Sequence, residues 1–142
     1  MSILISGDFH NNECGEILFL EKEYLLKRYS QKQYREIQYH IILGDAGFLW
    51  QGKEGKEGVN MNILSKRPFP ILCVMGNLDP VLGRHDLPEV DIGIGEKVIM
   101  VRREKPLVAY LKRGNIYHID NKKFLALGGS LSIDKRSGFI ER

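Results

Sequence analysis

The sequence has little from which a disulfide framework or a membrane span could be built. It holds two cysteines, Cys14 and Cys73, and Cys73 lies inside an apolar run where a small core residue is expected. Its apolar runs are too short to cross a bilayer, and its start lacks the basic and apolar regions of a secretory signal. We therefore expect a cytoplasmic protein with reduced thiols and no membrane partner.

The chain also has few aromatic residues and a small net charge. Aromatic residues make up 9% of the chain, and the formal net charge is +3. Basic residues are mixed with acidic ones, as in Glu21-Lys22-Glu23, which is typical of a solvated surface. This pattern disfavours a dedicated binder of single-stranded nucleic acid, although nucleic acid stays open as a partner. The hydrophobic content of 43% suffices for one core, so we expect a single domain over residues 1–142.

What the sequence does contain is a repeated pairing of an apolar run with glycine and a polar side chain. Three such runs end in Gly7-Asp8-Phe9-His10, Gly44-Asp45 and Gly76-Asn77. Runs of this kind are typical of strands buried on both faces, and the segments between them predict a β-α-β-α-β order with parallel strands. Because the carboxyl ends of parallel strands meet at one edge, we expect Asp8, His10, Asp45 and Asn77 to surround one point.

These residue types predict a site for divalent metal ions. Carboxylate, amide and imidazole donors suit Mn, Fe, Zn, Ni or Mg, and no thiolate is needed. Asp8 and His10 are spaced so that both can bind one ion from a turn, and Asp45 can bridge to a second ion. Two neighbouring ions, one of which activates a water, are typical of hydrolysis at phosphorus. The pattern leaves the catalytic residues unknown, and we expect no organic cofactor.

The ordered motifs Gly7–His10, Gly44–Gly47 and Gly76–Asp79 resemble the signature of the calcineurin-like metallophosphoesterases. The segment Leu127–Lys135 is similar to a Gly-Gly-Ala-x-Ser-x-Asp-Lys segment of a bacterial and phage branch of that family. The resemblance covers nearly the whole chain. It implies an α-β-β-α sandwich of two sheets, a phosphomonoester or phosphodiester substrate, and hydrolysis by a water that two divalent metal ions activate.

The chain departs from the family pattern in two places. Leu78 stands where the family has a histidine that assists the leaving group or the transition state, and the closing histidine motifs have no counterpart before Arg142. We therefore expect a domain that is incomplete at its C-terminus and a poor catalyst in isolation. Two functions stay open: a metal-dependent phosphoester hydrolase, and a catalytically impaired remnant that binds metal or phosphate or serves as a scaffold.

The remaining segments predict an α/β fold in which helices flank a parallel-to-mixed sheet. Helices are expected at about Cys14–Ser30 and Val59–Ser65, with a polar loop at Gln51–Gly58. An antiparallel meander in a second layer is predicted from strands at Lys97–Arg102, Leu107–Leu111, Asn115–Ile119 and Lys122–Leu127. The last two strands are joined by a predicted two-residue turn at Asp120-Asn121. An unpaired edge of this meander would favour self-association, and a homodimer is one way to close it.

Five other side chains are weaker candidates for the site. His40, which the sequence places at the start of the second strand, and His118 in the hairpin are expected to be structural. The loops beside the predicted site carry Trp50, Arg84 and His85, which could line it but have ordinary packing or solvated interpretations as well.

Overall fold

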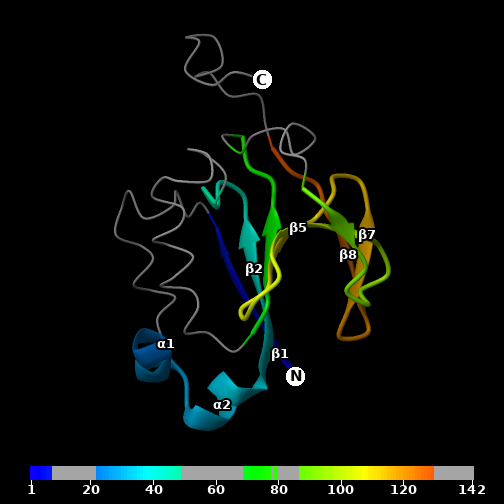
Figure 1. Ribbon diagram of the computed structural model, residues 1–142. Coiled ribbons are helices and arrows are strands. Elements are labelled where there is room, and N and C mark those ends of the chain that lie inside the picture. The colour runs from blue at the N-terminus through cyan, green and yellow to red at the C-terminus, as the bar shows by residue number, and fades with distance from the viewer. Residues whose placement is uncertain (8–21, 49–68, 78, 80–86, 130–142) are drawn as a thin grey trace.

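The computed structural model describes residues 1–7, 22–48, 69–77, 79 and 87–129. Within these ranges the chain forms a six-stranded sheet, two short helices and a separate two-stranded hairpin (Figure 1). The following sequence predictions lie outside the described residues: Asp8, His10, Trp50, Leu78, Arg84, His85, the first part of the helix at 14–30, the loop at 51–58, the helix at 59–65 and the tail at 130–142.

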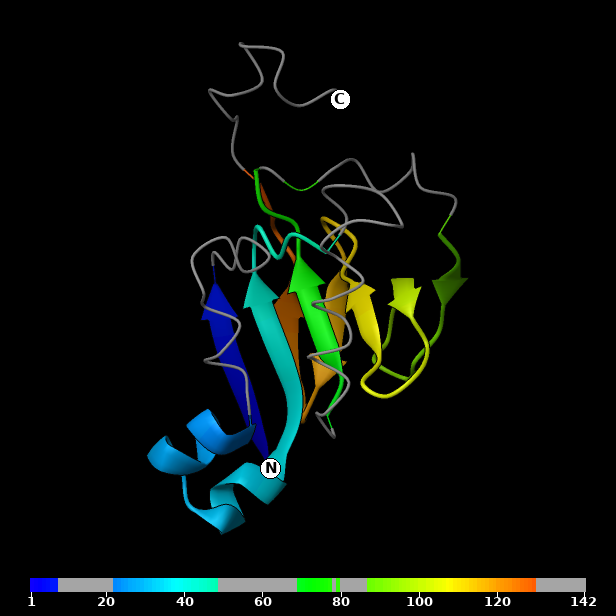
Figure 2. The ribbon, with the colours of Figure 1, turned by 60° about the vertical axis from the view of Figure 1, so that its left-hand side comes forward.

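The large sheet has the strand order β1-β2-β3-β6-β5-β4. Its parallel members are β1 (Ser2–Gly7), β2 (Ile37–Leu43), β3 (Ile71–Val74) and β6 (Val108–Tyr110). The sheet continues through antiparallel pairings to β5 (Val98–Arg102) and β4 (Glu89–Val90). The predicted mixed α/β class is confirmed. The four parallel strands end along one side of the sheet, called the carboxyl edge below (Figure 2).

The place of β5 and β6 differs from the sequence prediction. The sequence assigns both strands to a meander in a second layer, whereas β6 pairs in parallel with β3, with Cys73 opposite Tyr110. All three residues of β6 are buried, so this strand carries side chains into the core on both faces. An uninterrupted apolar run of this kind is stable only in the interior of a sheet, because an outer layer would leave one face in water.

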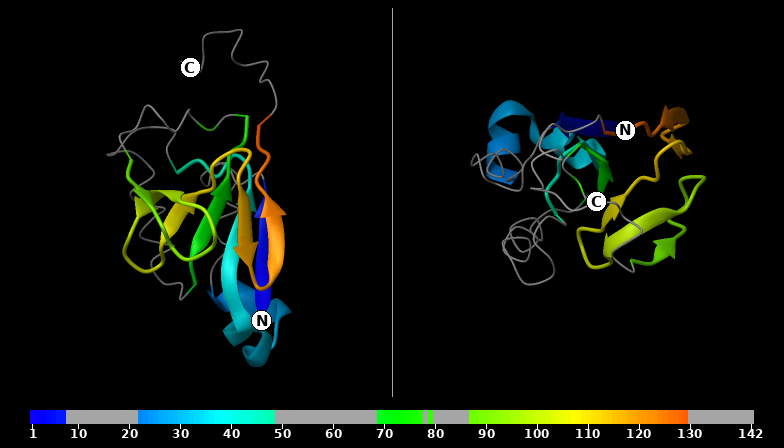
Figure 3. Two further views of the ribbon diagram at one scale, coloured as in Figure 1. Left: turned by 90° about the vertical axis from the view of Figure 1, so that its right-hand side faces the viewer. Right: turned by 90° about the horizontal axis from the view of Figure 1, so that it is seen from above.

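The second layer among the described residues is a hairpin of β7 (Ile116–Ile119) and β8 (Lys122–Leu125), which packs on one face of the large sheet (Figure 3). The predicted turn at Asp120-Asn121 is confirmed. Both residues have positive φ, at 51° and 58°, as a two-residue turn of this hand requires.

Neighbouring residues of the central strands face opposite sides of the sheet. Ile42 and Cys73 lie in the core on one side, together with Phe48 from the segment after β2. Ile41 and Leu72 pack on the other side, in the same core as Tyr117 of the hairpin. Burial on both faces fixes the register, because a shift by one residue would exchange the two sets of side chains.

In the described part of the segment before β2, residues 22–36, the chain forms two helices where the sequence predicts one. These are α1 (Lys22–Arg28), within the predicted range, and α2 (Gln31–Glu36). Ser30 separates them, because its hydroxyl accepts a hydrogen bond from the Gln33 backbone N–H at 3.2 Å and its own N–H donates to the Gln33 side chain at 2.9 Å. No helix among the described residues is long and apolar enough to cross a membrane.

The second strand begins at Ile37 and not at His40, so the histidine lies in the middle of β2. Its side chain is fully buried, and its Nε2 is 2.8 Å from the hydroxyl oxygen of Ser6 on β1. The ring of Phe69 packs edge-on at 6.5 Å between centroids. His40 therefore ties β1 to β2 inside the sheet rather than at the carboxyl edge.

Candidate metal centre at the carboxyl edge

Asp45 lies in a left-handed turn that leaves β2. Gly44, Asp45 and Gly47 have positive φ values of 84°, 45° and 77°. Glycine adopts this conformation without penalty, aspartate tolerates it, and most other residues lose about 1–2 kcal/mol. Asp45 is 6% exposed, and Ala46 and Phe48 after it are buried in the core. The buried residues on its C-terminal side fix the position of the Asp45 carboxylate.

The end of β3 contacts this turn directly. The Gly44 N–H donates to the Val74 carbonyl at 3.0 Å, which carries the pairing of β2 with β3 beyond the strands themselves. A Cβ added to Gly76 would overlap both the carboxylate and the backbone nitrogen of Asp45. Only glycine at position 76 therefore allows the loop that carries Asn77 to approach Asp45 this closely.

The loop after β3 is anchored by Asp79, for which the sequence predicts no role. Its Oδ2 accepts a hydrogen bond from the Gly76 N–H at 2.7 Å, and its Oδ1 accepts one from the Tyr110 hydroxyl at 3.3 Å. Asp79 is 6% exposed, and Tyr110 on β6 is fully buried. Because both carboxylate oxygens accept hydrogen bonds from protein donors, Asp79 positions the Gly76 loop. The short Gly-x-x-Asp spacing is the feature of the sequence that indicates such a local hydrogen bond from backbone to side chain.

Cys73, on β3 just before the same loop, is fully buried, as the sequence predicts. Burial raises the pKa of its thiol well above the ordinary range, and the negative charge of Asp79 adds to the effect. The thiol therefore stays protonated and behaves as a small core side chain.

The paired glycines late in the chain reach the same edge. A Cβ on Gly128 would overlap the carbonyl oxygen of Met75, and a Cβ on Gly129 would lie 3.0 Å from the carbonyl oxygen of Gly76. Gly129 also has a positive φ of 66°. Three glycine-containing motifs, at Gly44, Gly76 and Gly128-Gly129, thus pack backbone against backbone at the carboxyl edge.

The structure describes two of the four predicted metal ligands, Asp45 and Asn77. Asn77 directly follows Gly76, whose backbone contacts Asp45. Asp8 and His10 lie outside the described residues, although Gly7 before them is paired in register with Leu43, next to the Asp45 turn. Within the described ranges no three His, Cys, Asp or Glu side chains form a group that could hold a metal ion. The four-residue metal site stays a prediction.

A cavity of about 540 Å³ lies at the opposite end of the parallel strands. It is lined by Met1, which precedes β1, by His118 of β7, and by Asp120 and Lys122 on either side of Asn121 in the hairpin. The Asp120 carboxylate lies 3.9 Å from the Lys122 ammonium. His118 is thus remote from Asp45, and this cavity is not the predicted metal centre.

Comparison of the chain with family models, with curated proteins and with solved structures found no match.

Proposed function

We propose that this protein is a metal-dependent phosphoester hydrolase of the calcineurin-like type, with the α-β-β-α sandwich of that family. The observation that carries the proposal is the contact of Gly76 with the carboxylate of Asp45, at the aligned ends of two parallel strands. The carboxyl edge of a parallel sheet is where α/β proteins bind their ligands. The Gly-Asp and Gly-Asn motifs reach this edge in the order that the resemblance implies.

The donors at this edge fit a hard or borderline divalent cation. Asp45 offers carboxylate oxygens and Asn77 an amide oxygen, which suit Mg, Mn, Fe, Ni or Zn. In the proposed site Asp8, His10 and Asp45 hold one ion, and Asp45 and Asn77 hold the second. Such ions supply an activated water and neutralise the charge that develops on phosphoryl oxygens. The protein keeps the donors in place through the Gly76 contact and the hydrogen bonds of Asp79.

The proposal is tested by assaying the purified chain against p-nitrophenyl phosphate and its bis-ester with added Mn²⁺ or Ni²⁺. We expect turnover that depends on the metal and that falls about 10²–10⁴-fold in Asp45→Asn. Asp120→Asn is the matched control, since it removes a carboxylate at the far end of the strands and should leave the rate unchanged. Metal-independent turnover, or equal rates in both variants, would contradict the proposal.

The alternative, a module that binds metal or phosphate without efficient catalysis, is favoured by one observation. Leu78 occupies the position of the family's catalytic histidine. Loss of such a group lowers rates about 10²–10⁴-fold, so we expect turnover below about 1 s⁻¹. A chain that binds Mn²⁺ by calorimetry, loses this binding in Asp45→Asn, and hydrolyses neither ester would establish the module. Leu78→His should raise the rate if the hydrolase proposal is correct.

A further inference from the structure

The fourth parallel strand end brings an arginine to the carboxyl edge. Beyond β6, Leu111 continues the pairing with β3, because its N–H donates to the Cys73 carbonyl at 2.8 Å. The chain then turns through Lys112, Arg113 and Gly114 before β7. Gly114 has a positive φ of 84°, and its N–H donates to the Ala126 carbonyl at 2.8 Å. Arg113 therefore follows β6 as Asp45 follows β2.

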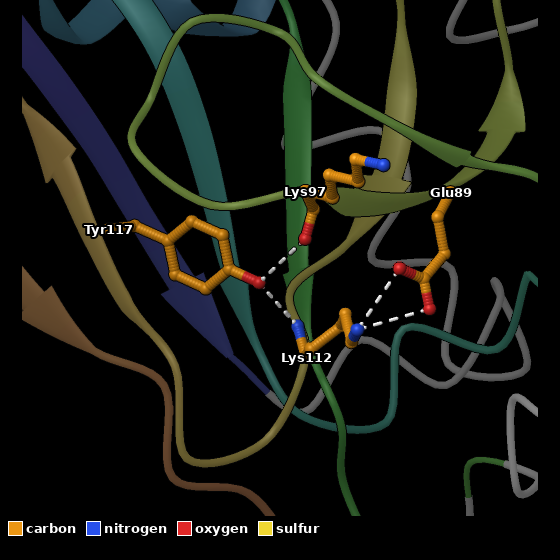
Figure 4. A network of polar contacts seen from close by, with 4 residues as sticks. All are labelled: Glu89, Lys97, Lys112 and Tyr117. Carbon is orange, nitrogen blue, oxygen red and sulfur yellow. Dashed lines mark hydrogen bonds and ion pairs between the residues drawn. The ribbon is translucent and has the colours of Figure 1, made fainter.

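The turn that carries Arg113 is held firmly at the preceding residue (Figure 4). The backbone N–H of Lys112 donates to the Tyr117 hydroxyl at 2.7 Å, and that hydroxyl donates to the Lys97 carbonyl at 3.2 Å. Burial raises the pKa of Tyr117, so its hydroxyl stays protonated and able to donate. The Lys112 ammonium lies 3.0 Å from both carboxylate oxygens of Glu89. Glu89 offsets the Lys112 charge, whereas Arg113 forms no ion pair with any acidic side chain that the structure describes.

The Arg113 guanidinium contacts Gly129, which packs against the Gly76 loop. Its Nη2 donates to the Gly129 carbonyl at 2.6 Å, and Arg113 is exposed. A Cβ added to Gly129 would lie 2.9 Å from this Nη2 and 3.0 Å from the Gly76 carbonyl oxygen. The guanidinium and the Gly76 carbonyl therefore both lie next to Gly129. Gly76 in turn contacts Asp45. A continuous chain of contacts thus links Arg113 to the proposed metal ligands.

We infer that Arg113 binds the phosphoryl oxygens of the substrate at the carboxyl edge. A guanidinium carries five N–H donors in a planar fork that matches phosphate oxygens, and the bond to Gly129 uses one of them. The firm turn reduces the conformational entropy that binding would cost. The inference rests on the proposed hydrolase function, and it adds a residue for substrate recognition.

The inference is tested with inorganic phosphate as the probe, in buffer without added metal, by calorimetry or ³¹P NMR. Three variants separate charge from packing: Arg113→Ala, Arg113→Gln, which can still donate to the Gly129 carbonyl, and Arg113→Lys. We expect the Ala and Gln variants to bind phosphate about 10–100-fold more weakly than wild type, with intermediate affinity for Lys. Arg103→Ala, at another exposed arginine, is the matched control and should bind phosphate like wild type. Thermal unfolding checks that each variant is folded.

Kinetics on p-nitrophenyl phosphate with Mn²⁺ supply the second measurement. We expect Arg113→Gln to raise KM by a factor similar to its loss of phosphate affinity. Wild-type affinity in Arg113→Gln, or wild-type protein that binds no phosphate, overturns the inference whatever the turnover. Phosphate binding that depends on Arg113, in a protein that turns over neither ester, supports the inference and contradicts the hydrolase proposal alone.

Discussion

The backbone of Gly76 lies so close to the carboxylate of Asp45 that a methyl group cannot fit between them. This contact joins the ends of β2 and β3 and sets the position of the carboxylate. Position 76 therefore affects both the stability of the fold and the geometry of the proposed metal centre.

Replacing Gly76 with alanine should displace the Asp45 carboxylate. We expect a loss of about 1–3 kcal/mol in the free energy of unfolding, the usual result of overpacking, together with weaker Mn²⁺ binding. Urea denaturation and calorimetry measure the two effects. Gly93→Ala is the control, since Gly93 has a positive φ of 80° and open space around an added Cβ. This variant should lose about 1–2 kcal/mol in the free energy of unfolding without any change in metal binding. Unchanged Mn²⁺ affinity in Gly76→Ala would show that the contact does not set the site.

Asp79 and Tyr110 should be energetically coupled. Tyr110→Phe removes one donor to the carboxylate, and Asp79→Ala leaves the Gly76 N–H and the Tyr110 hydroxyl without this acceptor. We expect losses of about 1–3 kcal/mol for each single variant, because both groups are buried. The double variant should lose less than the sum of the two in urea denaturation. Additive effects would contradict the coupling.

The buried thiol of Cys73 should make the protein less stable at alkaline pH. Its pKa is raised in the folded state above the ordinary value of 9.0, so above about pH 9 the unfolded chain releases a proton that the folded chain keeps. The free energy of unfolding should therefore fall as pH rises, by up to about 1.4 kcal/mol per pH unit. Urea denaturation between about pH 8 and 10, compared with Cys73→Ala, isolates the contribution. The variant should show a flatter dependence, and an identical slope would contradict the prediction.

Exposed apolar side chains on the hairpin should promote self-association. Ile116 and Leu125 face each other across β7 and β8 and are 47% and 55% exposed, and Leu127 is 66% exposed. Among the described residues β8 has no strand partner other than β7, so its outer edge can pair with another chain. We expect a dimer in light scattering, and Leu125→Lys should shift it toward monomer. Tyr29→Lys, which changes an exposed side chain near α1, is the control, and a wild-type monomer at high concentration would contradict the prediction.

Short-range features of the fold could be predicted from the sequence because they depend on neighbouring residues. The Asp120-Asn121 turn follows from the tolerance of both residues for positive φ, and β1, β2 and β3 follow from apolar runs that end in glycine. The predicted helix ends at Ser30, close to the end of α1 at Arg28, whereas the pattern does not predict α2 after it, although Ser30 and Gln33 form a local capping box.

Pairing between strands that are far apart in the chain sets which strand ends share the carboxyl edge. The apolar run around β6 fits equally a meander strand or a central parallel strand, and only its pairing with β3 distinguishes them. That pairing brings Tyr110 to Asp79 and puts Arg113 beside Gly129. The positions at which the strands end could be predicted from their glycine and polar residues, because backbone sterics are local. Which of these ends meet depends on burial on both faces of the sheet, which joins residues far apart in the chain.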